Sequence, residues 1–213
     1  MKRLRSVLCL ISVFLFLLTA AIGLPIYIRP FYYAHIEAFD LARVSGYSEA
    51  EIREAYDEVL DYLTLPGREF STGVMPHSAD GRDHFVDCKG LFDLNASAFL
   101  GSGLVLAVLF LMRKKWGPYR IGRHSAPFWA AVLSVTAPVM IGGLAALDFD
   151  RAFVIFHSIF FPGKTNWVFD WYQDPIIRVL PQEFFMDCAI LIGGGLITMA
   201  VGILVWESRK KKT

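Results

Sequence analysis

Residues 6–28 read SVLCLISVFLFLLTAAIGLPIYI, and none of them carries a charge. Three further stretches, 94–112, 126–147 and 188–206, share this property. Each is long enough to cross about 30 Å of hydrocarbon, which takes roughly 20 helical residues. One charge at the centre of such a helix would cost about 2.5–3.5 kcal/mol. The sequence therefore predicts an all-α, polytopic membrane protein with four transmembrane helices.

The composition argues against a large soluble core. Hydrophobic residues make up 55% of the chain and charged residues only 19%, whereas soluble domains usually have about 25% charged residues. The first stretch follows the basic tip 1–5, so a cleaved signal peptide is the alternative to a span. Its length and the lack of a clear small-residue cleavage site favour a retained anchor, with residues 1–28 forming the tip and the first span.

Basic residues are concentrated in three short segments, which sets the expected orientation. Residues 1–5, 113–125 and 207–213 hold 12 of the 21 lysines and arginines but only one of the 20 acidic residues, Glu207. Short loops rich in lysine and arginine face the cytoplasm, so both termini are expected there, in a multi-pass protein of the plasma membrane. Residues 29–93 and 148–187 would then face outward. The basic segments suit the anionic inner leaflet and require no nucleic-acid partner.

The first outer segment contains one well-marked helix. Ser48 and Glu51 form a capping box, and the helix is expected to stop at Leu65-Pro66-Gly67. Apolar residues recur between these points at helical spacing, namely Ile52, Tyr56, Val59 and Leu63. The opposite face is acidic and is expected to be solvated; it carries Glu51, Glu54, Asp57, Glu58 and Asp61.

The second outer segment is rich in aromatic residues and predicts short amphipathic helices at the outer membrane surface. One is expected over residues 151–161. Asp174-Pro175 predicts the start of another, with Asp174 as its N-cap and Pro175 at the first helical position.

Ionisable residues crowd the start of the second span, where anchoring does not require them. The stretch 83–93 includes His84, Asp87 and Lys89. Placing such groups at a membrane boundary costs free energy, so their presence indicates a function. A further histidine, His157, lies inside an apolar run rich in phenylalanine. It must have a partner or stay neutral, so it is either a hydrogen-bonded structural histidine or a functional one.

Three motifs resemble the signatures of one family. They are DHFVDCKGLF at residues 83–92, FHSIFF at 156–161 followed by Trp167, and LPQEFF at 180–185. All three resemble the lipoprotein intramolecular transacylase family, Lit. The number and orientation of the spans are also similar, so the resemblance covers nearly the whole chain. Cys88 departs from the small aliphatic residue that the family pattern would have there.

The resemblance implies an acyltransferase. Lit enzymes act on diacylated bacterial lipoproteins, whose N-terminal cysteine carries a thioether-linked diacylglyceryl group, and move the sn-2 acyl chain to the α-amino group of that cysteine. The product is the lyso form, an N-acyl, S-monoacylglyceryl lipoprotein. The expected partners are the lipoprotein substrate and membrane lipid, and no cofactor or metal is implied.

The site residues follow from this chemistry and from the resemblance. An amine that attacks an ester needs a base, the departing oxygen needs an acid, and histidine can serve as both near neutral pH. His157 and His84 are the expected acid–base pair, with either one as the base. The expected orienting, oxyanion-binding or headgroup-binding candidates are Asp87 (beside His84), Asp150 (beside His157), Lys89, Arg151 and Asn166. The expected acyl-chain contacts are Phe153, Phe156, Phe160 and Trp167.

Two other functions stay open. His77, His84, Asp87 and His157 could bind zinc or copper, and the acidic helix and aromatic segment could serve a non-catalytic membrane scaffold. Within the enzymatic interpretation, transfer could be direct or could pass through an acyl-enzyme, for which Cys88 is the alternative nucleophile. Whether Cys88 pairs with Cys188 is also open.

Overall fold

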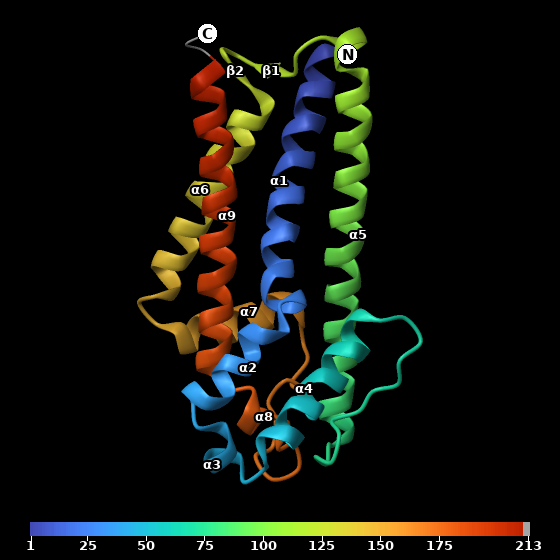
Figure 1. Ribbon diagram of the computed structural model, residues 1–213, viewed down its shortest axis with the longest axis vertical. Coiled ribbons are helices and arrows are strands. Elements are labelled where there is room, and N and C mark those ends of the chain that lie inside the picture. Colours follow the sequence, from blue (N-terminus) through green and yellow to red (C-terminus); the bar gives the residue numbers. More distant parts are fainter. Residues whose placement is uncertain (211–213) are drawn as a thin grey trace. The chain divides into compact units, whose positions relative to one another are not determined.

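The computed structural model describes residues 1–210, and helices dominate it (Figure 1). In chain order its elements are α1 (Lys2–Tyr27), α2 (Arg29–Ala38), α3 (Leu41–Ser45), α4 (Glu49–Thr64), α5 (Ala79–Trp116), β1 (Arg120–Ile121), β2 (His124–Ser125), α6 (Ala126–Ala145), α7 (Phe149–Phe160), α8 (Ile176–Val179) and α9 (Gln182–Lys210). Lys211 and Lys212 of the expected basic tail lie outside the described residues.

Contacts between residues divide the chain into two units. The span unit comprises residues 1–24, 95–147 and the chain from 189 onward. The site unit comprises residues 25–94 and 148–188. Because α5 and α9 are long, each contributes residues to both units.

Four helices in the described part of the chain are long and apolar enough to cross a membrane: α1, α5, α6 and α9. In the span unit, α1 presents four residues at four-residue spacing, which places them on one face of the helix. This face, made of Cys9, Val13, Leu17 and Ala21, is buried against Leu109, Ala126, Ala130 and Leu196. Much of the remaining apolar surface of these helices is exposed, as expected for helices solvated by lipid. The predicted all-α, four-span membrane fold is confirmed.

The basic segment 113–125 was expected to be a plain loop, but it contains a small hairpin. Strand β1 pairs antiparallel with β2, with Arg120 opposite Ser125. Gly122 lies in the turn with a φ of 61°, a conformation that glycine adopts without strain. The Ser125 side chain then caps α6 by accepting a hydrogen bond from the backbone N–H of Phe128 at 3.1 Å, so strand pairing and helix start are joined locally.

A buried core in the site unit joins α2, α4 and α8. Tyr32 of α2 stacks on Tyr56 of α4 with ring centroids 3.7 Å apart, and its hydroxyl donates to the carbonyl oxygen of Val179 at 2.7 Å. The predicted capping box of Ser48 and Glu51 is present at the start of α4. The four predicted apolar positions of this helix are buried, so its boundaries and its inner face are confirmed.

The acidic face of α4, predicted from the sequence to be solvated, also makes contacts within the protein. Arg29 forms ion pairs with Asp57 and Asp61. Glu58 accepts a hydrogen bond from the backbone N–H of Gly73 at 2.9 Å. The segments before and after α4 therefore fold back onto its acidic face. The helical period of α4 alone does not reveal these contacts.

Asp174 does not have the role predicted for it. The helix α8 begins at Ile176, with Pro175 in the N-cap position. The Asp174 carboxylate instead accepts hydrogen bonds from the backbone N–H and the hydroxyl of Ser78, at 2.7 and 2.9 Å. Ser78 directly precedes α5 and caps it, since its hydroxyl oxygen accepts a hydrogen bond from the backbone N–H of Gly81 at 2.9 Å, and Asp174 holds this capping residue in place. Asp174 is 2% exposed, and its buried charge makes these bonds necessary.

The close approach of Asp174 to α5 generates a stability prediction. A Cβ atom on Gly81 would lie 2.3 Å from Oδ1 of Asp174, whereas a Cβ on Gly90 of the same helix would meet no atom within 4 Å. We expect Gly81→Ala to displace the carboxylate and to lower the free energy of unfolding by about 1–3 kcal/mol. Thermal unfolding of the detergent-solubilised protein measures this, with Gly90→Ala as the matched control. Equal unfolding temperatures for the two variants would contradict the prediction.

Candidate active site

The two histidines predicted to work together lie side by side in the site unit. His84 comes from α5 and His157 from α7, 73 positions later in the printed sequence. Their ring centroids are 5.9 Å apart, and each residue is only 6% exposed. A reacting group that fits between or beside the rings could therefore contact both imidazoles.

The surroundings of His157 assign its tautomer. Its Nδ1 lies 2.8 Å from the carbonyl oxygen of Phe153, and because a carbonyl oxygen can only accept, Nδ1 carries the proton. In the neutral ring the lone pair is then on Nε2. The Trp167 ring stacks on the imidazole with centroids 4.5 Å apart. Burial lowers the pKa of His157, against the opposing effect of the bond to Phe153, so the ring is a neutral base near pH 7.

His84 is also buried among aromatic side chains. The rings of Phe161 and Phe169 contact it edge-on, at centroid distances of 4.9 and 5.5 Å. Burial, followed by the proximity of His157, lowers the pKa of His84 to about 4. Its Nε2 is 3.4 Å from the sulfur of Cys88. Its Nδ1 is buried and has no hydrogen-bond partner among the described residues.

Cys88 places its thiol beside Nε2 of His84. Burial raises the pKa of its thiol to about 12, so the thiol keeps its proton near neutral pH. A protonated thiol can donate to Nε2 of His84, which leaves the imidazole proton on the partnerless Nδ1. Cys88 and Cys188 are both free, so the disulfide left open by the sequence is not formed.

The spacing of one helical turn suggested that Asp87 orients His84. The structure shows no hydrogen bond between the two side chains. Its carboxylate accepts hydrogen bonds from Nζ of Lys164 and, at 3.0 Å, from Nδ2 of Asn166. Burial alone would raise the pKa of Asp87, but the bonds from Lys164 and Asn166 outweigh it and lower that pKa. Asp87 is therefore an ionised anchor for the loop that follows α7.

Lys164 was missed by the sequence analysis. It follows the turn Pro162-Gly163 and stands as a lone cation between aromatic residues, which was the only available signal. Its backbone carbonyl accepts a hydrogen bond from Nε1 of Trp167 at 3.1 Å. Lys164 thus links Asp87, through its side chain, to the indole that stacks on His157.

Three other candidates are held elsewhere in the site unit. Asp150 accepts a hydrogen bond from Gln182 and makes no bond to His157. Lys89 donates to the carbonyl oxygens of Tyr62 and Leu65. Arg151 is exposed. The structure therefore brings together His84, His157, Asp87 and Asn166 from the predicted set, and it gives Asp150 and Lys89 structural partners.

The predicted acyl-chain contacts divide into two kinds. Phe156 and Phe160 are each 48% exposed and pack on each other at 4.6 Å between centroids. Phe153 and Trp167 are partly buried and cover His157, at centroid distances of 4.3 and 4.5 Å.

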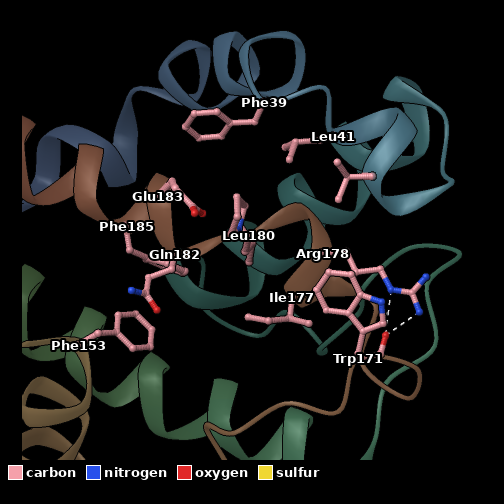
Figure 2. Close-up of a pocket in the computed structure, with 12 residues that line it drawn as sticks. Phe39, Leu41, Phe153, Trp171, Ile177, Arg178, Leu180, Gln182, Glu183 and Phe185 are labelled. Carbon is pink, nitrogen blue, oxygen red and sulfur yellow. Dashed lines mark hydrogen bonds between the residues drawn. The ribbon is translucent and has the colours of Figure 1, made fainter. Parts of the chain in front are cut away.

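Phe153 also lines a groove of about 530 Å³ (Figure 2). Its walls are mainly apolar and include Phe39 after α2, Leu41 at the start of α3, and Leu180 and Phe185 around the start of α9. Figure 2 shows Phe153 and Phe185 at one end of this groove, and Trp171 with Arg178 at the other. Because Phe153 also contacts His157, the groove and the histidine pair share one wall.

The geometry does not support the metal-binding alternative. Among the described residues, no group of three or more histidine, cysteine or acidic side chains is placed to hold a metal ion. His77 instead packs against Phe70, with ring centroids 4.9 Å apart, and its Nδ1 lies 3.3 Å from the hydroxyl of Thr72.

Comparison with known proteins gives one family. The family model described as lipoprotein intramolecular transacylase Lit matches residues 7–185. No curated protein matches the chain. A solved structure of the membrane-integral lipoprotein intramolecular transacylase Lit from Bacillus cereus is similar at a TM-score of 0.87 and 24% identity, covering 100% of this chain and 98% of that chain.

Two further structures of the Bacillus cereus protein, in which a histidine is replaced by alanine or by arginine, match at a TM-score of 0.81 and 24% identity. The two matches cover 100% of this chain and 96% and 94% of those chains. The likeness in structure establishes a shared fold, and the family model extends over most of the sequence. The chain belongs to the lipoprotein intramolecular transacylase family, Lit.

Proposed function

We propose that this lipoprotein transacylase moves the sn-2 acyl chain of an S-diacylglyceryl cysteine to the α-amino group of the same cysteine. The observation that carries the proposal is the pair of neutral, buried imidazoles with centroids 5.9 Å apart. The product would be the N-acyl, S-monoacylglyceryl form of the lipoprotein.

The reaction turns an ester into an amide, so its difficulty is kinetic. The α-amine titrates near pH 8, and only its neutral form attacks the ester carbonyl. A C–N bond forms, the C–O bond to glycerol breaks, and one proton moves from nitrogen to the departing oxygen. Because amine and ester belong to one molecule, holding its headgroup in a bent conformation supplies a large part of the rate acceleration.

His157 is the group suited to carry that proton. Its Nε2 holds the lone pair, because Nδ1 donates to Phe153. It would take the proton from the attacking amine and return it to the glycerol oxygen when the tetrahedral intermediate collapses. General acid–base catalysis of this kind typically contributes about 10²–10⁴-fold in rate.

His84 is suited to a different task. With a pKa of about 4 it stays neutral, and a neutral imidazole N–H is a hydrogen-bond donor rather than an acid. Its partnerless Nδ1 would donate to the oxyanion of the tetrahedral intermediate. Removing one such donor typically costs about 3–4 kcal/mol of transition-state stabilisation. The transfer is then direct, and no acyl-enzyme is required.

The remaining parts of the site bind lipid in this proposal. The groove beside Phe153 is large and apolar enough for an acyl chain, and it shares its wall with His157. The exposed rings of Phe156 and Phe160 would contact further chain or membrane lipid. The distribution of lysine and arginine supports a site on the outer leaflet of the plasma membrane, with both termini in the cytoplasm.

The first prediction tests the histidine pair. We expect His157→Gln and His84→Leu each to lower N-acylation by about 100-fold or more, because the first removes the base and the second removes the oxyanion donor. Mass spectrometry of a reporter lipoprotein's N-terminal peptide, in a bacterium that lacks other N-acylating enzymes, measures the product. His77→Gln is the control, since His77 lies outside the site. Full activity in both variants would end the proposal.

A second prediction concerns Cys88. A serine hydroxyl can replace the thiol as donor to Nε2 of His84, so we expect Cys88→Ser to retain at least about half of the activity. The same reporter assay applies. An inactive Cys88→Ser variant that inserts normally in the membrane would instead favour a covalent thiol intermediate.

A third prediction follows from the lowered pKa of His84. The folded protein should take up no proton at His84 until the pH approaches about 4, whereas an unfolded chain takes it up near 6.5. Folding stability from this residue therefore decreases as the pH falls from about 6.5 towards 4. Histidine-labelled NMR, with the signal assigned by His84→Gln, should show no titration of His84 between about pH 5.5 and 8. A midpoint near 6.5 would contradict it.

A further inference from the structure

The orientation of the Asn166 side chain is determined by its partner. Its Nδ2 lies 3.0 Å from Oδ2 of Asp87, and an ionised carboxylate can only accept a hydrogen bond, so the amide nitrogen must face it. The amide oxygen, Oδ1, therefore points away from Asp87. The bond to Asp87 uses one of the two N–H donors of the amide, and Oδ1 is the acceptor that the side chain still offers.

Oδ1 of Asn166 is buried and receives no hydrogen bond from any described residue. Within the site unit, only one other buried side-chain atom of the described residues shares this condition, Nδ1 of His84. Buried polar atoms in folded proteins are nearly always paired, so each exception calls for an explanation. One of these two atoms is an acceptor, and the other is a donor when the thiol of Cys88 donates to Nε2 of His84.

The two atoms complement the two reacting groups of the substrate. An ester carbonyl needs a donor as negative charge develops on its oxygen, and Nδ1 of His84 supplies it. A neutral primary amine has two N–H bonds and one lone pair. If one N–H is held by an acceptor and the other is given up to His157, the lone pair is directed at the carbonyl carbon.

The charges around Asn166 favour a neutral amine. A bare carboxylate would stabilise the ammonium form and raise the pKa of the amine, which would remove the nucleophile at neutral pH. Here the charge of Asp87 is compensated by its ion pair with Lys164. The amide oxygen of Asn166 can accept an N–H without carrying a charge of its own, and the two imidazoles proposed to act on the substrate have lowered pKa values, so they add no charge near pH 7.

We propose that Oδ1 of Asn166 is the binding site for the α-amino group of the lipoprotein substrate. This assignment rests on the proposed acyl transfer and adds to it the residue that positions the nucleophile. Trp167, the next residue in the chain, stacks on His157, so the loop that would hold the amine also forms one wall around its base.

The test separates two fates of the ester. When the amine is held, the acyl chain moves to nitrogen; when it is not, water can attack the same carbonyl and release a free fatty acid and the glycerol hydroxyl. In Asn166→Leu, which keeps the side-chain size but not the acceptor, we expect the ratio of N-acyl product to free fatty acid to fall at least about tenfold. Purified protein, a diacylated lipopeptide and mass spectrometry of both products measure this ratio.

Asn166→Asp is the matched variant, because it keeps an oxygen acceptor and adds a charge. We expect it to retain N-acylation while the acid limb of the rate–pH profile moves to higher pH, since a carboxylate raises the pKa of the bound amine. If the leucine variant does not fold, as judged by its unfolding temperature, this shift decides the question.

Each failure has its own signature. An unchanged product ratio in folded Asn166→Leu, an equal loss of both products in it, or an unshifted profile in Asn166→Asp would overturn the assignment of Asn166. Absence of any N-acyl product from the unmodified protein would instead overturn the proposed acyl transfer itself.

Discussion

The Asp87 carboxylate holds two distant parts of the site unit together, and the arrangement of the histidines depends on it. It accepts hydrogen bonds from Lys164 and Asn166, which anchors the loop after α7 to α5. Trp167 of that loop stacks on His157, whereas His84 lies one turn before Asp87 on α5. One ionised side chain therefore connects the wall around one imidazole to the helix that carries the other.

Burial among aromatic rings decides the protonation state of this pair. In water both imidazoles would titrate near pH 6.5, and one of them would often be charged in the acidic range. Packed against Phe161, Phe169 and Trp167, both stay neutral, so one can act as base and the other as hydrogen-bond donor. The same low polarity strengthens a hydrogen bond to an oxyanion. The aromatic residues thus set the electrostatics of the site.

Apart from one atom each of His84 and Asn166, the buried side-chain nitrogen and oxygen atoms of the described residues in the site unit have hydrogen-bond partners. Ser48 caps α4, Asp148 caps α7, and Asp174 bonds to the residue preceding α5. Where a protein adjoins lipid, unsatisfied polar groups are particularly expensive. Against this background, the partnerless atoms of His84 and Asn166 are informative, because the proposed reaction requires a donor for the oxyanion and an acceptor for the amine.

Features that depend on near neighbours in the chain could be predicted from the amino-acid sequence. The four spans follow from the length and the lack of charge of 6–28 and its three counterparts, and α4 follows from its capping box and apolar period. The motif around His84 and the histidine in the phenylalanine-rich run pointed to the pair. These features are local because helix formation and membrane insertion act on single segments.

Hydrogen-bond partners from distant segments depend on how the whole chain folds. Asp87 was expected to orient His84 but bonds to Lys164, some 77 positions away; Asp174 was expected to cap its own helix but bonds to Ser78, 96 positions away. A carboxylate accepts from whichever donor folding brings closest, and the helical period that orders one segment carries no information about which other segment packs against it. The fold class could therefore be predicted, whereas the hydrogen bonds that shape the site required the folded chain.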